Sequence, residues 1–299
     1  MRDFETRTYG KWILAGEHAV LRGCPALAFP LLTRYLDLQY KLSQEPLSVD
    51  FAGPHGPEIN LLFYGVLENA MTRLRVSEAP RGRFRVTNTL PIGAGLGASA
   101  ALCGAISRWC EAQGWIGLDE VYEFARKLED LFHGESSGVD LAVSLSAQGI
   151  RFVRGGEREI LKPAWWPNLY LSYSGQRGMT SDCVTKVKRL FETDPKLAEA
   201  LDARMREAVL LAERSLQHSE AKAREELKDA FEKAESCFSE WGLTFGELEK
   251  HIVMLREHGA VAVKPTGSGG GGYVLSLWDQ DPPEKLRATL VAVPEPLIS

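Results

Sequence analysis

The sequence lacks any long hydrophobic run. None of its apolar stretches approaches the roughly 20 residues that a membrane-spanning helix needs. Charged residues interrupt the first twenty positions, MRDFETRTYGKWILAGEHAV, before the apolar core of a secretory signal can form. We therefore expect no membrane association and a cytoplasmic location.

A concentrated stripe of Lys and Arg is also missing. The formal net charge is -5 and the pI is about 5.8, and acidic and basic residues are interspersed along the chain. A nucleic-acid surface needs clustered positive charge. The sequence therefore predicts no nucleic-acid partner.

Cysteine is scarce, and its spacing matches no metal site. The five cysteines are an odd number and include no CxxC pair. Such usage is typical of a reducing compartment. We expect all five to be free thiols in the core, namely Cys24, Cys103, Cys110, Cys183 and Cys237.

What remains has ordinary globular proportions, with 299 residues, 44% hydrophobic and 25% charged. This length favours two domains, which we place at residues 1–167 and 168–299. β-prone runs between Gly and Pro predict strands, and runs with a 3.6-residue period predict helices. The mixture predicts an α+β fold. The predicted strands are 8–16, 30–42, 82–91, 149–155, 169–174, 260–265, 271–278 and 288–294; the predicted helices are 98–114, 118–134 and several within 195–258.

A glycine-rich stretch, LPIGAGLGASAAL at residues 90–102, stands out between a predicted strand and a predicted helix. Gly93, Gly95 and Ala98 satisfy the dinucleotide pattern G-x-G-x-x-A. That fold needs an acidic residue at the end of a second strand, whereas Glu111 lies in the continuing helix. No Lys-Ser or Lys-Thr pair follows the glycines, which excludes the P-loop.

Two interpretations of this stretch remain open from the residues alone. The backbone N–H groups and the dipole of the helix that starts here can bind a phosphate. The Ser99 hydroxyl is then of the type that ligates the Mg²⁺ carried by a nucleotide. Alternatively, the glycines only permit close packing of the helix.

Four strings resemble the conserved blocks of the GHMP kinases, which phosphorylate small alcohols with ATP. The glycine-rich stretch fits P-x-x-x-G-L-G-[SA]-S-A, and KWILAGEHAVLRGCPALAFPL, HGESSGVDLAVS and KPTGSGGGGYVLSLW follow the family's order. The resemblance implies two domains, one like the second domain of ribosomal protein S5 and one ferredoxin-like. It also implies that Mg²⁺ and ATP are bound, with the nucleotide contacting Pro91, Ile92, Gly93, Ala94, Gly95, Leu96, Gly97, Ala98 and Ser99.

Two charged residues take catalytic positions in this resemblance. Asp140, in SGVD, matches the aspartate that receives or orients the hydroxyl proton, and Lys11, in GKWIL, matches the lysine that pairs with it. A lysine nearby would stabilise negative charge developing on the acceptor oxygen. Without the resemblance, Asp140 would more often be a loop cap and Lys11 a solvated charge at the end of a strand.

Glu129 matches the second Mg²⁺ ligand of the family, beside Ser99. At about 100° per residue, Glu129 lies roughly 90° from the centre of an apolar stripe, and Asp130 lies nearly opposite that stripe. Glu129 is therefore predicted to flank buried surface; a solvated carboxylate is the alternative. The stripe consists of Val121, Phe124, Ala125, Leu128, Leu131 and Phe132.

The acceptor alcohol is indicated by the string GEHAV. It resembles the members of the family that phosphorylate the 5-hydroxyl of mevalonate in isoprenoid synthesis, and Thr180 also matches a threonine near their substrate. The resemblance implies substrate contacts from Lys11, Glu17, His18, Asp140 and Thr180. Alternatives are the members that act on phosphomevalonate, galactose or homoserine, and a ligand-binding regulator without turnover.

The chain departs from the family pattern at two positions. Ala98 stands where the first of two serines is usual, and Ser136 replaces the proline usual before S-G-[VL]-D. The first change removes one hydrogen-bonding group from the phosphate loop, and the second loosens the turn that aims Asp140. Neither removes a catalytic group. A homodimer is a further possibility.

Overall fold

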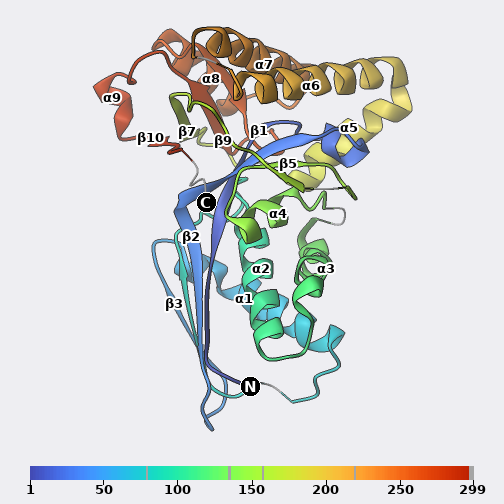
Figure 1. The fold of residues 1–299 in the computed structure, drawn as a ribbon, viewed down its shortest axis with the longest axis vertical. Coiled ribbons are helices and arrows are strands. Elements are labelled where there is room, and N and C mark those ends of the chain that lie inside the picture. Colours follow the sequence, from blue (N-terminus) through green and yellow to red (C-terminus); the bar gives the residue numbers. More distant parts are fainter. Residues whose placement is uncertain (79, 134–135, 157, 219, 296–299) are drawn as a thin grey trace. The chain divides into compact units, whose positions relative to one another are not determined.

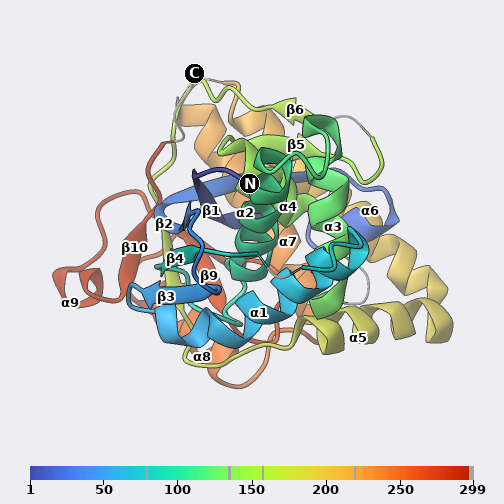
Figure 2. The same cartoon turned by 90° about the horizontal axis from the view of Figure 1, so that it is seen from below.

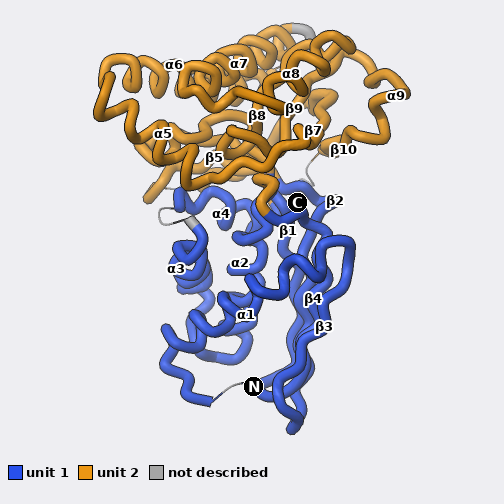
Figure 3. The backbone as a smooth tube through the Cα atoms, turned by 180° about the vertical axis from the view of Figure 1, so that it is seen from behind, with its two compact units in different colours: residues 1–11, 30–92, 96–147 blue, residues 12–29, 93–95, 148–299 orange. Residues whose placement is uncertain are grey.

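The computed structural model describes residues 1–78, 80–133, 136–156, 158–218 and 220–295. The chain forms two compact units, neither of which is a continuous segment (Figure 3). The first contains residues 1–11, 30–92 and 96–147, and the second contains residues 12–29, 93–95 and 148–299. The predicted division into 1–167 and 168–299 stays a prediction. Every helix in the described part is too short or too polar to cross a bilayer.

The first unit contains parts of two long strands, β1 (Phe4–Ala15) and β2 (Ala26–Lys41), which pair with each other. β4 (Arg83–Asn88) runs antiparallel to Leu36–Lys41 of β2, and β3 (Ser48–Ala52) runs parallel to β4. In the paired part of β2, buried and more exposed side chains alternate. That alternation turns one face of the sheet toward the core.

Helix α2 (Ala98–Ala112) is the centre of the helical layer in this unit, and α1, α3 and α4 all contact it. Nearly every one of its side chains is buried, as expected for a helix that is apolar all round. α1 (Gly56–Arg73) also contacts β3 and β4 (Figure 2). A 3₁₀ turn at Leu118–Glu120 leads into α3 (Val121–His133), and α4 (Val139–Ser146) follows.

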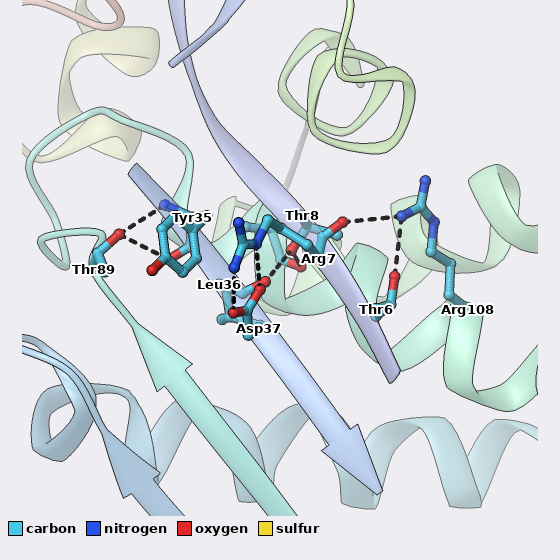
Figure 4. Close-up of polar contacts among 9 residues, drawn as sticks. Thr6, Arg7, Thr8, Tyr35, Leu36, Asp37, Thr89 and Arg108 are labelled. Carbon is cyan, nitrogen blue, oxygen red and sulfur yellow. Dashed lines mark hydrogen bonds and ion pairs between the residues drawn. The ribbon is translucent and has the colours of Figure 1, made fainter. Parts of the chain in front are cut away.

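Polar contacts hold β1 in register within the first unit (Figure 4). Arg7 forms a bidentate pair with Asp37 of β2, with N···O distances of 2.6 and 2.7 Å. Arg108 of α2 donates to the Thr6 hydroxyl at 3.1 Å, and the Thr8 hydroxyl donates to a backbone carbonyl in α2 at 2.8 Å. These contacts fix the strand three residues before Lys11.

The second unit contains a four-stranded antiparallel sheet in the order β10-β7-β9-β8. A separate pairing joins β5 (Ile150–Phe152) to residues Ala26–Ala28 of β2 and to β6 (Arg158–Ile160). The strands of the four-stranded sheet are β7 (Leu169–Tyr173), β8 (Ala262–Pro265), β9 (Tyr273–Leu277) and β10 (Leu290–Ala292).

Helices of the second unit pack beside this sheet. α6 (Pro195–Ser215) and α7 (Glu220–Glu240) lie side by side, and α7 contacts β8 (Figure 1). α8 (Glu247–Glu257) buries apolar side chains against β8 and β9. α6 begins at Pro195, directly after its N-cap residue Asp194. The Asp194 carboxylate accepts a hydrogen bond from the backbone N–H of Leu197 at 3.1 Å. Two further helices are α5 (Thr180–Thr193) and α9 (Glu284–Arg287).

The predicted α+β class is confirmed, and each predicted strand or helix contains an element of that type. Gly134, the last residue of the predicted helix 118–134, lies outside the described residues. The prediction missed β3, β6, α1, α4, α5, α9 and a 3₁₀ turn at Ala19–Arg22. All five cysteines are free and buried, as expected.

Candidate active site

The glycine-rich stretch is a turn that opens α2. Gly93, Gly95 and Gly97 all have positive φ angles, of 71°, 84° and 79°. Gly97 is the N-cap of α2, and its carbonyl accepts from the N–H of Ala101 at 2.9 Å. The N–H groups before that bond have no carbonyl within the helix to pair with. The turn therefore directs backbone donors and the positive end of the helix dipole to one place.

Lys11 lies directly against this turn. A Cβ atom added to Gly97 would lie 3.0 Å from the Lys11 Cγ and 3.8 Å from Oδ2 of Asp140. The backbone N–H of Lys11 donates to the carbonyl of Leu96 at 3.0 Å. Glycine at position 97 is therefore required both by its positive φ and by the space that the lysine side chain occupies.

The two predicted catalytic residues form an ion pair. Nζ of Lys11 lies 3.1 Å from Oδ1 of Asp140, and the lysine side chain is 4% exposed while the aspartate side chain is 28% exposed. Asp140 is in the first turn of α4, which begins after Gly138 with φ 83°. The amine is thus enclosed and the carboxylate keeps an accessible edge beside the start of α2.

Glu129 is buried on α3, with only 1% of its surface exposed. The Ser136 hydroxyl donates to its Oε2 atom at 2.6 Å. Burial, together with the nearby charge of Asp140, raises the pKa of Glu129 to about 8. Near neutral pH Glu129 is therefore mostly protonated, and a cation bound beside it would displace that proton.

The donors present fit Mg²⁺. Ser99, in the first turn of α2, offers a hydroxyl, and Glu129 lies on α3, which packs on α2. No cluster of three or more His, Cys, Asp or Glu suited to a metal occurs among the described residues. Mg²⁺ uses few protein oxygens and fills its other positions with water and phosphate, so an all-protein cage is not needed.

Glu17, a predicted substrate residue of the second unit, is paired with a buried lysine. Nζ of Lys264 donates to Oε1 of Glu17, and the two side chains are 0% and 1% exposed. The same Nζ also donates to the carbonyl of Ile13 at 3.3 Å. The pair thereby ties the GEHAV segment to β8, the strand that leads into the glycine-rich segment 266–272.

His18 and Thr180 meet at one residue of that glycine-rich segment, Ser268. Nε2 of His18 is 2.8 Å from the Ser268 carbonyl, and the Thr180 and Ser268 hydroxyls are 3.3 Å apart. The structure therefore brings together three strings that lie far apart in the sequence. All of these contacts lie within the second unit.

The protonation of His18 follows from its surroundings. Burial lowers its pKa to about 4, and the ring packs edge-on against Trp241 and Phe238. With Nε2 facing a carbonyl, the neutral tautomer that carries its proton on Nε2 is favoured, which leaves Nδ1 as an acceptor. His18 is thus suited to accept a hydrogen bond rather than to act as a cation for a carboxylate.

Sequence reasoning missed Lys264, Ser268 and Gln176. Gln176 holds the glycine-rich segment, because its Nε2 donates to the Gly270 carbonyl and its own carbonyl accepts from Gly272, both at 2.7 Å. The KPTGSGGGG string was recognised for its glycines, but its first residue was not singled out. A lysine inside the otherwise apolar predicted strand AVAVKP is the signal that could have drawn attention to Lys264.

Comparison with known proteins agrees with this geometry. Residues 62–148 match the family model of the GHMP kinases N terminal domain. Similar relatives include mevalonate kinases. That of Pyrococcus abyssi is 28% identical over 97% of this chain and 92% of its own length.

Solved structures show the same fold. L. major mevalonate kinase in complex with R-mevalonate superimposes with a TM-score of 0.74 at 23% identity, covering 96% of this chain and 89% of that one. Streptococcus pneumoniae phosphomevalonate kinase gives a TM-score of 0.71 at 16% identity, covering 93% of each chain. At these identities the likeness establishes the fold and not the acceptor.

Proposed function

We propose that this chain is a mevalonate kinase, which transfers the γ-phosphoryl group of ATP to the 5-hydroxyl of mevalonate and so yields 5-phosphomevalonate for isoprenoid biosynthesis. The observation that carries the proposal is the Lys11–Asp140 pair, 3.1 Å apart, against the turn that opens α2. The mevalonate kinases that resemble nearly the whole chain support it.

The nucleotide would bind to residues 91–99. Their backbone donors suit the phosphate oxygens, and the positive φ angles of the glycines keep those donors unobstructed by side chains. Ser99 and Glu129 would hold the Mg²⁺ that accompanies ATP. When bound, that ion neutralises charge on the phosphates and favours the ionised form of Glu129.

The chemistry left to this chain is positioning and proton handling. The 5-hydroxyl oxygen forms a bond to the γ-phosphorus while the bond from that phosphorus to the bridging oxygen of ADP breaks. The accessible edge of Asp140 orients the hydroxyl and accepts its proton. Lys11 stabilises the negative charge that develops on the attacking oxygen and on the phosphoryl group.

The remaining predicted substrate contacts are Glu17, His18 and Thr180. His18 is neutral in the folded state, so it would accept a hydrogen bond from an acceptor hydroxyl through Nδ1. Thr180 would contribute its hydroxyl, which Ser268 already orients. Glu17 is paired with Lys264 inside the unit, and its role would be to hold this segment in place.

A substrate panel tests the proposal. ADP release is measured with purified protein, Mg²⁺–ATP and, in turn, mevalonate, phosphomevalonate, galactose and homoserine. Mevalonate is expected to give the highest kcat/KM, and phosphomevalonate is the first rival because the same fold serves a phosphomevalonate kinase. Preference for another acceptor would reject mevalonate, and nucleotide binding without turnover on any acceptor would favour a regulator.

A further inference from the structure

Ser136 makes two hydrogen bonds that link α3, which carries Glu129, to α4, which carries Asp140. Its hydroxyl donates to Oε2 of Glu129 at 2.6 Å and accepts from the backbone N–H of Gly138 at 3.1 Å. Glu129 belongs to α3, and Gly138 is the N-cap of α4, whose first turn carries Asp140. A serine hydroxyl can donate one hydrogen bond, and in this structure that hydrogen bond goes to Glu129.

The turn is braced a second time from α3. The Tyr122 hydroxyl donates to the Gly138 carbonyl at 3.2 Å, and a Cβ atom on Gly138 would lie only 2.2 Å from that hydroxyl oxygen. The position of Gly138 is therefore set by α3 through Tyr122 and through Ser136. The Ser136 contact also engages the carboxylate of Glu129.

Proline, the residue usual here in the family pattern, would act differently. Its ring fixes φ and stiffens the turn, but it has no hydrogen to donate to a carboxylate. In this chain a hydrogen bond replaces the covalent restraint. The orientation of the turn then depends on the same hydroxyl that orients Glu129.

We propose that Ser136 is a positioning residue that aligns both Glu129 and Asp140. Mg²⁺ binding and activation of the acceptor hydroxyl then depend on the same serine side chain. The inference rests on the proposed function, because Glu129 is a metal ligand only if the chain binds Mg²⁺ with ATP. Residues that orient a metal ligand through hydrogen bonds affect metal affinity and activity by about 10- to 100-fold when they are replaced.

The test compares S136A, S136T, S136P and, as the matched control, S137A. Ser137 lies in the same turn, and its hydroxyl accepts from the Val139 N–H at 3.3 Å. ADP affinity is measured by calorimetry over a Mg²⁺ titration, and kcat is measured with Mg²⁺–ATP and mevalonate. Thermal melting of each variant reports whether it is folded.

S136A is expected to need about tenfold more Mg²⁺ for half-maximal ADP affinity, and its kcat is expected to fall by a similar factor. S136T keeps the hydroxyl and should stay within about twofold of the wild type, as should the Mg²⁺ requirement of S137A. S136P should keep the Mg²⁺ defect, because the donor is missing, while its stiffer turn restores part of kcat.

Two results would overturn the inference: a folded S136A with the Mg²⁺ requirement and kcat of the wild type, or an S136P variant whose Mg²⁺ requirement is normal. Failure of the proposed function looks different. If the wild type phosphorylates no acceptor while S136A still shows weakened Mg²⁺-dependent ADP binding, the role of Ser136 toward Glu129 stands, and the kinase assignment and the role toward Asp140 fall.

Discussion

Each unit of the molecule contains an enclosed lysine paired with an acidic side chain, and the two pairs differ in how open they are. In the first unit, Lys11 is enclosed but Asp140 is 28% exposed. In the second, Lys264 and Glu17 are 0% and 1% exposed. The carboxylate of the first pair is therefore partly exposed to solvent, whereas both side chains of the second pair are buried.

This difference in exposure indicates different roles for the two pairs, one in the proposed reaction and one in the stability of the fold. A carboxylate that must meet a substrate hydroxyl needs an accessible edge, which Asp140 has. The charges of a fully buried pair repay the cost of burial only while both partners remain. We therefore expect changes at the first pair to affect turnover and changes at the second to affect stability.

The largest effect is expected from D140N, which keeps the shape of the side chain and removes its charge. Loss of the proposed general base and of the partner of Lys11 should lower kcat by about 10⁴-fold. ADP affinity should stay near that of the wild type, because the backbone proposed to bind the phosphates is untouched. Steady-state kinetics and calorimetry measure the two quantities.

D37N is the matched control, since Asp37 is 25% exposed and pairs with Arg7 of β1, the strand that also carries Lys11. Its kcat should equal that of the wild type. A D140N enzyme that retains more than a tenth of wild-type kcat would remove Asp140 from the mechanism and erase the contrast between the pairs.

The next effect is expected from K264M, which leaves the Glu17 carboxyl buried without its partner. Breaking a buried pair from one side costs about 3–5 kcal/mol in the free energy of unfolding. The double variant E17Q/K264M should recover much of this loss, because no isolated charge then remains. Urea denaturation of the single and double variants measures both quantities.

K250M is the surface control, because Lys250 pairs with Glu247 where the two side chains are 74% and 59% exposed. It should change stability by less than about 0.5 kcal/mol. If K264M unfolds at the same urea concentration as K250M, the buried pair gives no support and this half of the comparison is wrong.

The smallest effect concerns pH and His18, the neighbour of Glu17. Burial depresses the folded-state pKa of His18 from 6.5 to about 4. Between these values the unfolded chain binds the additional proton, so stability is full above pH 6.5 and falls as the pH drops toward 4. H18N should remove up to about 3 kcal/mol of this pH dependence.

Urea denaturation at about pH 4.5 and about pH 7 measures the difference between the two proteins. Asn is a reasonable replacement because His18 has a φ of 57°, which Asn tolerates better than most other non-glycine residues. Wild-type and H18N curves that fall in parallel with pH would show that His18 is not held neutral.

The helix that carries Glu129 shows how far sequence reasoning reached. The periodicity correctly predicted Val121, Phe124 and Leu128 in the core and Asp130 in solvent. Leu131, predicted on the same stripe, is 48% exposed. A single helical period describes one face only, and it could not show that packing on α2 and α4 would bury Glu129 completely.

The missed helices have physical reasons as well. α4 is eight residues long and contains two valines, so its local propensity is weak and its helical state depends on packing against α2. α1 follows a Gly-Pro pair and has polar residues on several sides. The local sequence of each segment therefore gives only a weak helical signal, and packing against neighbouring elements stabilises the helix.

For the site, the resemblance named Lys11 and Asp140, and the structure places their charged atoms in contact. Their roles remain proposals. Lys264 was missed because a lysine is ordinarily assumed to face solvent. Only the folded chain shows that Glu17 lies beside it, 247 positions away in the sequence.

The burial of Lys11 and Lys264, at 3% and 0% exposure, makes both amines chemical reporters. Acylating reagents attack a neutral amine that they can reach, so the folded protein would be labelled on its surface lysines and spared at these two. The appearance of label at position 264 in a mass spectrum would then time the opening of the second unit, and label at position 11 that of the first.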